Sequence, residues 1–566
     1  MRGILNVVQK ICANAWCKTP FEITEDDLSF YDKISPIFGD RKYGIPPPTH
    51  CPDCRFQRRM IWRREHALKS RTCSNCNKPI ISIHTTDTQY PVYCLPCWWS
   101  DNFDPLSYGK DIDLNRSFIT QFGALLKSVP QITMMNDNGV GSENCEYCQD
   151  FAFGKNCYLI TGAWELQDCY YCDGNCLKSR HLFDCYSVHY SELVYDSLAS
   201  QHLYRCIHLN HCENCNNCSF GIDLKGCQDC LGCIGLRQKH FYIFNQQYSE
   251  TEYRQKVTSF RLDSKEGMKY FNDQFEKWAL SFPRKYAHLV NCENCIGDDL
   301  FNCKDVLGFL EDGAEYCKFI VHGDAPKNSY DVSQTGRPEW CYEGATPDNS
   351  YMTHFTTWCW KDKNVLYSDN CHSCEHLFGC IALKRKQYCI LNKQYSQDEY
   401  GRLVSKIIER MSSDGEWGEF FPVELSPYCY NETAAQEYFP LQKEQVIQRG
   451  LQWRDEDPHL YKAQTVTVPD TIRDVPDVIT EDLHACETCK RNFRILPQEL
   501  SFYRNMSIPV PLTCYECRYM ERVNRRNPRK LWKRHCMKCQ KQIETSYAPE
   551  RPEIVYCEEC YLKEVY

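Results

Sequence analysis

The sequence predicts a mainly β fold with small α additions, in which a cysteine-rich module at each end flanks a duplicated parallel β-solenoid that carries helical insertions. Six cysteines between positions 51 and 97 recur in register, without a gap, 463 residues further on. Between these two sets, leucine and cysteine columns align when the chain is written with a period of 21. The end of that repetitive block returns 147 residues later. The middle of the chain is therefore itself duplicated.

Composition places the chain among large globular proteins. It has 566 residues, 42% of them hydrophobic and 25% charged, which is enough for three or more domains. Its first residues contain only a short apolar run, and no later run approaches the length of a membrane span. We therefore expect a soluble, cytoplasmic protein without a membrane partner. In a reducing compartment, C-x2-C pairs usually bind metal, so zinc is the expected cofactor of many of the 41 cysteines.

The terminal cysteines have the spacing of tetrahedral zinc sites. A C-x2-C turn presents two thiolates to one metal, and a second turn completes a closed structural S4 site. Four zinc ions are expected from a sequential grouping of the pairs, of which only Cys12-x4-Cys17 has a looser spacing. A cross-braced grouping, first pair with third and second with fourth, fits the spacings equally well. The sequential groups are Cys12, Cys17, Cys51 and Cys54; Cys73, Cys76, Cys94 and Cys97; Cys486, Cys489, Cys514 and Cys517; and Cys536, Cys539, Cys557 and Cys560.

The residues around these pairs resemble a known family. The C-terminal set reads Cys486-Glu-Thr-Cys489, Phe493, Glu499-Leu500, Phe502-Tyr503 and Cys514-Tyr-Glu-Cys517-Arg518. The N-terminal set reads Cys17, Phe21, Asp27-Leu28, Phe30-Tyr31 and Cys51-Pro-Asp-Cys54-Arg55. Both resemble the short bacterial "probable zinc-ribbon" module, and the whole arrangement is similar to long cysteine-rich proteins of candidate-phylum bacteria. The resemblance implies metal binding and the architecture, but no activity. Cys12 departs from the module's spacing.

The middle of the chain repeats with a period that suits stacked β coils. A period of 21 aligns His181-Leu182-Phe183-Asp184-Cys185 with His202-Leu203-Tyr204-Arg205-Cys206 and with Asp223-Leu224-Lys225-Gly226-Cys227. Neighbouring coils of a parallel β-solenoid lie ~4.8 Å apart, so that like side chains form ladders. Helical repeats need about 33 or more residues per unit. We therefore expect a parallel β-solenoid with a coil of about 21 residues.

Helices are expected at a few defined places. Ser249 and Ser396 each begin a Ser-x-x-Glu capping box after matching strands, so a helix should follow each half of the solenoid. Residues 117–127 carry the apolar spacing of a short connector helix. The predicted organisation is an N-terminal double zinc-ribbon module (1–105), a connector helix (106–144), solenoid half 1 (145–248), a helical insertion (249–290), solenoid half 2 with its end helix (291–411), a linker (412–485) and a C-terminal double zinc-ribbon module (486–566).

The 25 cysteines outside the terminal modules allow three interpretations. A free thiol is a small hydrophobic group that packs well inside a narrow solenoid, and this is the preferred interpretation. Extra zinc sites between coils are the second. An iron–sulfur cluster at Cys227, Cys230 and Cys233 is the third, although the fourth ligand and trailing proline of that motif are missing.

No catalytic motif is present. The sequence contains no P-loop, dinucleotide-binding glycine motif, zinc-protease motif, nucleophile elbow or deaminase signature, and we name no catalytic residue. An enzyme that acts on a polymer through surface carboxylates of the solenoid is accordingly the third hypothesis for function.

The segments that connect the two zinc sites of each module are strongly basic, although the chain as a whole has a formal net charge of −9. Their charge exceeds what two zinc–thiolate sites need, and aromatic residues are interleaved with the arginines. The leading hypothesis is a scaffold that binds nucleic acid, namely structured RNA or a ribonucleoprotein. The alternative is a zinc-stabilised protein-interaction scaffold without nucleic acid, whose arginines offset thiolate charge. The predicted contacts are Arg55, Arg58, Arg59, Trp62, Arg63, Arg64, Arg71, Arg518, Arg522, Arg525, Arg526, Arg529, Lys530, Trp532, Lys533 and Arg534.

Overall fold

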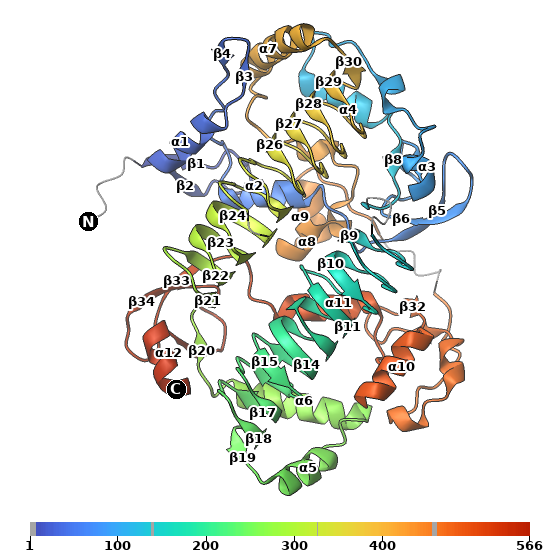
Figure 1. Cartoon of the computed structure of the whole chain (residues 1–566), viewed down its shortest axis with the longest axis vertical. Coiled ribbons are helices and arrows are strands. Elements are labelled where there is room, and N and C mark those ends of the chain that lie inside the picture. Colours follow the sequence, from blue (N-terminus) through green and yellow to red (C-terminus); the bar gives the residue numbers. More distant parts are fainter. Residues whose placement is uncertain (1–6, 137–140, 325, 456–460) are drawn as a thin grey trace. The chain divides into compact units, whose positions relative to one another are not determined.

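Two compact units make up the chain, and each is built from two separate stretches of sequence. The computed structural model describes residues 7–136, 141–324, 326–455 and 461–566. Unit 1 combines Met1–Asn138 with Leu289–Arg454, and unit 2 combines Gly139–His288 with Asp455–Tyr566 (Figure 1). Each unit therefore joins one terminal module to the half of the repetitive middle that is not next to it in the chain. Over the described residues the fold is mainly β with twelve α-helices.

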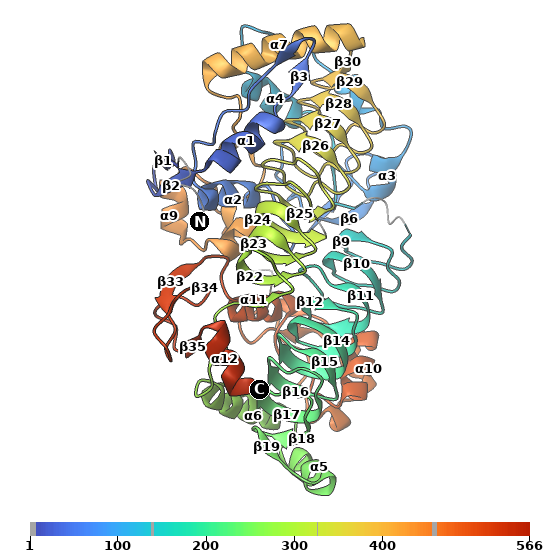
Figure 2. The ribbon, with the colours of Figure 1, turned by 60° about the vertical axis from the view of Figure 1, so that its left-hand side comes forward.

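Parallel strands stacked in register form the core of unit 2. Residue i of one strand pairs with residue i+12 of the next, as in Tyr186 with Leu198 and Val194 with Cys206, apart from one step of 13 at Trp164 with Leu177. Figure 2 shows these strands as successive layers. They are β9 (Gln149–Ala152), β10 (Thr161–Gln167), β11 (Leu177–Phe183), β12 (Tyr186–His189), β13 (Glu192–Tyr195), β14 (Leu198–Asn210), β15 (Glu213–Asn216), β16 (Ser219–Ile222), β17 (Gln228–Ile234) and β18 (His240–Ile243), closed by the antiparallel β19 (Gln246–Gln247).

Unit 1 contains an equivalent parallel core. The first steps of its register join residue i to i+11, as in Ile296 with Leu307, and the later ones join i to i+12, as in Thr353 with Val365. The strands are β21 (Leu289–Val290), β22 (Ile296–Phe301), β23 (Lys304–Asp312), β24 (Glu315–Asp324), β25 (Ser333–Gly336), β26 (Tyr351–His354), β27 (Lys363–Leu366), β28 (Glu375–Phe378) and β29 (Gln387–Ile390), closed by the antiparallel β30 (Lys393–Gln394).

A repeat of three residues determines this register. From Asn175 to Gly235 every third residue has a positive φ, and the residue that follows each of them is an inward position of the stack. Four such triplets make one step from residue i to i+12. The expected coil with a period of 21 is therefore wrong as a pairing register. It arose because 21 is also a multiple of three, so inward cysteines and leucines align at either spacing.

Cysteine is the commonest side chain in the core of unit 2. The thiols of Cys157, Cys169 and Cys172 each donate to the carbonyl oxygen two residues earlier, at 3.2–3.4 Å. Ser179 and Ser191 make the same bond at their own inward positions. A thiol thus fills a narrow interior as a small hydrophobic group and also satisfies a carbonyl oxygen that faces inward.

The outer faces of the stacks reinforce the i to i+12 register. The Asn156 amide donates to Asp168 Oδ1 at 2.9 Å, which links one positive-φ position to the next along the stack. Ion pairs such as Lys155–Glu143 and Lys327–Glu315 join residues at the same offset. Each exposed pair contributes little by itself. Any slip of register would nevertheless bring like or unmatched side chains together along a whole face.

Helices form where the capping signals predicted them. Ser249 and Ser396 both complete capping boxes, at the start of α5 (Glu250–Ser259) and α7 (Gln397–Asp414). The predicted insertion continues into α6 (Lys265–Ala279), and the connector helix is α4 (Phe118–Leu126), capped by Ser117. Both capped helices begin where predicted, but the helical part of the insertion ends at Ala279 rather than near residue 290. The linker contains two short helices, α8 (Ala434–Tyr438) and α9 (Lys443–Gln448).

The terminal modules are small assemblies of hairpins and helices. In unit 1 the module comprises β1 (Val8–Ile11), β2 (Pro20–Ile23), α1 (Glu25–Lys33), β3 (Ile37–Phe38), β4 (Arg41–Lys42), α2 (Pro52–Met60), β5 (Lys69–Thr72), β6 (Pro79–Ser82), β7 (Val92–Tyr93) and α3 (Leu95–Trp99), and β7 pairs with β8 (Gln131–Ile132). In unit 2 it comprises β31 (His484–Ala485), β32 (Asn492–Phe493), α10 (Pro497–Met506), α11 (Tyr515–Arg525), β33 (Trp532–His535), β34 (Gln542–Thr545), β35 (Val555–Tyr556) and α12 (Glu558–Val565), and β35 pairs with β20 (Arg284–Lys285).

Candidate metal centres and the docking of the terminal modules

Four groups of four cysteines stand at the places that the spacings predicted. In each group the four sulfur atoms lie within 4.8 Å of one another, and the members follow the sequential grouping rather than the cross-braced one. Cys12, despite its looser spacing, belongs to the first group. The groups are consistent with zinc-ribbon-like modules, and each could hold a metal ion.

Every group is built from the same two local structures. The first pair of cysteines lies on a hairpin turn, where the residue after the second cysteine has a positive φ: Lys18, Asn77, Lys490 and Gln540. The second pair lies at the start of a helix, because Cys51, Cys94, Cys514 and Cys557 are the N-caps of α2, α3, α11 and α12. Both structures aim backbone N–H groups at the sulfurs, as in Cys51 N to Cys12 Sγ and Cys94 N to Cys73 Sγ, each 3.3 Å.

The sulfur separations fit a tetrahedral metal site. Across the two turns, the Sγ–Sγ distance is 3.7 Å for Cys17–Cys51 and 3.6 Å for Cys489–Cys514. A tetrahedron of Zn–S bonds of about 2.3 Å has edges of about 3.8 Å, whereas a disulfide needs about 2.05 Å. The donor set and its dimensions therefore suit a closed S4 zinc site, and they do not suit disulfides.

Electrostatics favour thiolate at one cysteine of each group. Hydrogen bonding from Cys54 lowers the pKa of Cys51 to about 5. Burial opposes ionisation of Cys73, but backbone N–H groups of Cys76 and Cys94 outweigh it and lower its pKa to about 6. The same balance lowers the pKa of Cys536 to about 6 and that of Cys486 to about 7. Thiolates are the form that binds metal.

The cysteines of the stacks do not gather in this way. Among the residues that the structure describes, none of them belongs to a group of three or more ligand atoms within 4.8 Å. Cys227, Cys230 and Cys233 each donate to a carbonyl oxygen two residues earlier instead. Packing is thus the interpretation that the geometry favours for them.

In unit 1 the arginines after Cys54 are buried against carboxylates of the stack. Arg55 Nη2 lies 2.7 Å from Asp331 Oδ2, and Arg58 Nη2 lies 2.8 Å from Glu343 Oε1. Arg59 contacts both carboxylates, at 3.8 Å and 3.5 Å, and its side chain is fully buried. Burial opposes the charge of Arg55, but Asp331 and its neighbours outweigh burial and raise its pKa. These arginines dock the module onto the stack.

Unit 2 repeats this docking with the other module and the other half. Arg518 Nε and Arg522 Nη1 each lie 2.9 Å from a carboxylate oxygen of Asp184. Arg522 also lies 3.8 Å from Asp196, which pairs with Arg525 as well. Burial disfavours the Asp196 carboxylate, yet Arg525 and its other cationic neighbours hold its pKa well below its usual value.

The two docking sites correspond residue by residue. Arg518 and Arg522 stand 463 residues after Arg55 and Arg59, while Asp331 and Glu343 stand 147 residues after Asp184 and Asp196. The ring contacts also correspond, with Phe30 stacked on Tyr330 at 3.7 Å and Phe502 stacked on Phe183 at 3.9 Å, although the module offset here is 472 residues because the two modules differ by nine residues in length. Tyr31–Tyr342 and Tyr503–Tyr195 are a further matching pair. Module and half were therefore duplicated together with their interface.

The predicted nucleic-acid contacts fall into two classes. The buried class takes part in packing and docking and cannot reach an RNA phosphate while the module is docked: Arg55, Arg58, Arg59, Trp62, Arg63, Arg64, Arg518 and Arg522. The remaining residues keep some exposure, and only Lys530 and Lys533 are fully in the exposed class: Arg71, Arg525, Arg526, Arg529, Lys530, Trp532, Lys533 and Arg534. The N-terminal basic connector is thus largely internal, whereas among the basic residues of the C-terminal connector only Arg518 and Arg522 are buried. The charge of the connectors is matched by carboxylates of the stack as well as by the cysteine groups.

Sequence reasoning missed the acidic partners. Asp184, Asp196, Asp331 and Glu343 gave no motif, because single acidic residues are common in the repetitive middle. One signal was present: the 147-residue offset of the middle relates Asp184 to Asp331 and Asp196 to Glu343, in step with the 463-residue offset of the arginines.

Comparisons with known proteins identify no family. No family model matches the sequence, and none of the curated proteins matches it. Among solved structures, the chain is similar to a putative acetyltransferase from Desulfovibrio desulfuricans G20, at 7% identity over 48% of this chain and 81% of that chain, with a TM-score of 0.10. A TM-score this low carries no argument about fold or function. Over the described residues, no helix has the length and apolar character that crossing a membrane requires.

Proposed function

We propose that the protein is a zinc-binding scaffold in which four zinc ions hold two terminal modules against two parallel β-solenoids whose coils pair mainly from residue i to i+12. The observation that carries this proposal is the pair of equivalent docking sites. In each, a helix that begins at a metal-site cysteine places its arginines on buried carboxylates of the stack. Zinc bound by the cysteines would fix the start of that helix, and the helix would fix the module on the solenoid.

Elemental analysis of the native protein tests the metal part of this proposal. Four zinc ions per chain are expected, and two or fewer would contradict it. Removing zinc should loosen the modules before the stacks, because ribbons of this size have little core of their own whereas the stacks are closed by long ladders of hydrogen bonds. Limited proteolysis after chelation should cut first within 7–105 and 486–566.

The scaffold would present its surfaces to other macromolecules, and protein partners are the favoured class. The arginines that first suggested RNA are used within each unit, so a partner meets the outer faces of the stacks and modules. Purifying the native protein and testing what accompanies it, with and without nuclease, separates protein partners from nucleic acid.

Nucleic acid is a second candidate, favoured by one exposed basic surface. Lys530, Lys533, Lys538 and Lys541 are all exposed on or beside the β33–β34 hairpin, and Lys530 lies 5.3 Å from the ring of Trp532. Exposed lysines beside an aromatic ring can hold phosphates while a base stacks. The equivalent positions of the N-terminal module are Ala67, Ser70, Asn75 and Lys78, so this surface belongs to the C-terminal module.

A charge-reversal experiment decides between the two candidates. Replacing the four lysines with Glu should abolish RNA binding and its salt dependence if the hairpin is the contact surface. The matched control replaces four exposed lysines elsewhere in unit 2, Lys239, Lys256, Lys269 and Lys277. Equal affinity in both variants, or no affinity in the unchanged protein, would leave the protein-interaction scaffold.

A further inference from the structure

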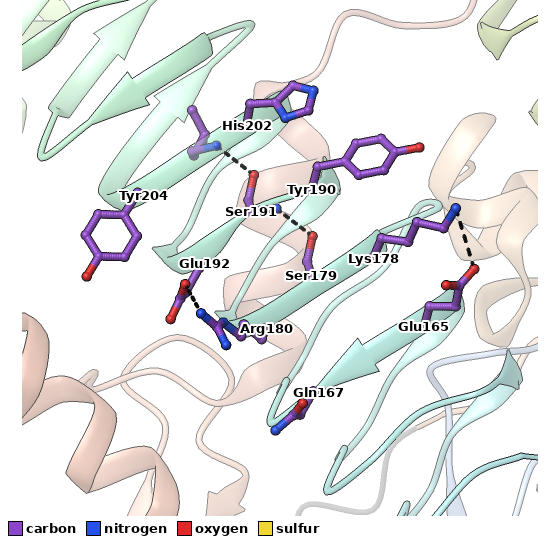
Figure 3. A pocket seen from close by; sticks show the side chains of 11 residues that line it. Glu165, Gln167, Lys178, Ser179, Arg180, Tyr190, Ser191, Glu192, His202 and Tyr204 are labelled. Atoms are coloured by element: carbon purple, nitrogen blue, oxygen red, sulfur yellow. Dashed lines mark hydrogen bonds and ion pairs between the residues drawn. The ribbon is translucent and has the colours of Figure 1, made fainter.

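A shallow groove on the outer face of the unit 2 stack has the chemistry of a ligand site. We propose that it binds a neutral, hydroxyl-rich chain, namely an oligosaccharide. The groove runs across β10, β11, β13 and β14 and encloses about 580 Å³ (Figure 3). All of its lining residues lie between 165 and 204, within one unit. The proposal does not depend on zinc or on RNA binding.

Successive strands supply the two walls of the groove. Arg180, Glu192 and Tyr204 are register partners in neighbouring strands and form one wall. Lys178, Tyr190 and His202 form the other, each at a position with positive φ. The lining residues come from successive strands that repeat at ~4.8 Å, so the groove is elongated, which suits a chain better than a compact molecule.

Serines form the floor and leave recognition to the walls. Ser179 and Ser191 are buried between the walls, and each hydroxyl already donates to a carbonyl oxygen of its own coil, Leu177 O at 2.8 Å and His189 O at 2.7 Å. The hydroxyl oxygens of Ser179 and Ser191 also accept the backbone N–H groups of Ser191 and Leu203, respectively. The floor is therefore small and polar but has its hydrogen bonds satisfied, so that a ligand is held from the sides.

The charges of the walls cancel. Lys178 Nζ lies 3.9 Å from Glu165 Oε1, and Arg180 Nη2 lies 2.6 Å from Glu192 Oε2. Two cations and two carboxylates give the groove no net charge, so it favours neither a polyanion nor a polycation. Arg180 is 58% exposed at its side chain, and it offers hydroxyl groups several donors beside the Glu192 acceptors. Neutral polyols match this mixture of donors and acceptors.

Exposed aromatic rings complete the walls. Tyr190 is 44% exposed and Tyr204 is 47% exposed, and Tyr190 stacks on His202 with ring centroids 5.2 Å apart and planes within 10°. A tyrosine presents an apolar ring and a polar tip, which is the surface that a sugar ring with its C–H faces and hydroxyl rim needs. Single-stranded nucleic acid also stacks on such rings, but it requires a positively charged groove.

The duplicated half shows that the scaffold does not need these rings. At the corresponding positions, 147 residues further on, Arg337 replaces Tyr190 and Asn349 replaces His202. Lys327, Glu339 and Tyr351 keep the other wall. The docking ion pairs are retained in both halves, whereas the Tyr190–His202 pair has no counterpart at the corresponding positions of unit 1, which carries a similar stacked pair elsewhere, at His376 and Tyr388. Tyr190 and His202 are therefore not required by the docking arrangement that the two halves share.

Titration of the full-length protein with cellohexaose, maltohexaose and chitohexaose tests the proposal, with hexagalacturonate and an RNA hexamer as anionic probes. We expect saturable calorimetric binding of at least one neutral hexasaccharide and little change in its affinity with salt. Absence of binding by all three neutral probes, or tighter binding of either anionic probe, would overturn the proposal.

Two variants and a matched control locate the site. Combining Tyr190→Ala with Tyr204→Ala should weaken binding about tenfold or more, because stacking surfaces are lost from both walls. Tyr351 is the equivalent of Tyr204 in the other half and is 43% exposed. Tyr351→Ala should therefore leave the affinity unchanged. Glu192→Gln keeps the shape but leaves Arg180 without its counterion. It should weaken neutral binding and admit hexagalacturonate. Equal affinity in the double variant and in Tyr351→Ala would refute the site even if neutral sugars bind.

Discussion

Removing Asp184 should release the C-terminal module from the stack of unit 2. Its carboxylate is fully buried and accepts from both Arg518 and Arg522 at 2.9 Å. Asp184→Ala therefore leaves two buried guanidinium groups without their main counterion. Breaking a buried ion pair by deleting one partner costs about 3–5 kcal/mol. Because two arginines share this carboxylate, we expect the upper part of that range for the free energy that holds the module in place.

Hydrogen exchange measures this loss locally. A chain of several units does not unfold in one step, so a global midpoint would mix the units. Amides of α11 should exchange about 100-fold faster or more, because every 1.4 kcal/mol is a factor of ten. Asp331→Ala is the matched change in unit 1 and should speed exchange in α2 instead. An acceleration of exchange of less than about tenfold in α11, or an equal acceleration in both helices, would refute the assignment of these ion pairs to docking.

Charge and shape can be separated at the same site. Replacing Asp184 and both arginines by apolar residues of similar size should recover most of the lost protection, since a buried ion network exchanged for hydrophobic packing is often neutral or stabilising. If the triple replacement remains as unstable as Asp184→Ala, the acidic residue supports the stack itself rather than the docked arginines.

Three further predictions concern metal, pH and packing. Cys94→Ser should lower the zinc content from four ions to three and increase proteolysis within 69–99 while leaving the C-terminal module intact, as mass spectrometry under native conditions can show. Burial raises the pKa of Asp362 to about 8 from a usual value of 3.8, so the stability that depends on its proton is complete below pH 4 and is lost as pH rises to about 8. The free energy of unfolding should fall by up to about 1.4 kcal/mol per pH unit over this range. Asp362→Asn should remove this fall, as chemical denaturation from pH 4 to pH 9 can show. The Cys206 thiol is fully buried and donates to Tyr204 O at 3.3 Å. Cys206→Ser should therefore keep the fold, whereas Cys206→Leu should lower the free energy of unfolding by about 1–3 kcal/mol through overpacking. Equal melting temperatures for the two variants would contradict the inward position of residue 206.

The sequence alone determined the parts of this protein that depend on local spacing. A C-x2-C turn needs only its own residues and one positive-φ position, such as Asn77, to present two thiolates, so all sixteen terminal cysteines could be named. Capping boxes at Ser249 and Ser396 are equally local, and both helices begin where predicted. The repetition of the middle was visible too. Its pairing register was not, because a triplet repeat aligns at every multiple of three.

Only the tertiary structure decided which surfaces face solvent. Arg59 and Lys533 look alike in sequence, since both stand in a basic run within three residues of a tryptophan. Arg59 is fully buried because Asp331 and Glu343, far away in the sequence, meet it across the interface between module and stack, while Lys533 is exposed on a hairpin. The crosswise assembly of each module with the more distant half was likewise hidden. The interface was duplicated along with the sequence, so each module carries the docking residues that either half could accept. Only the folded chain selects between them, because contacts between distant residues depend on where the whole backbone passes.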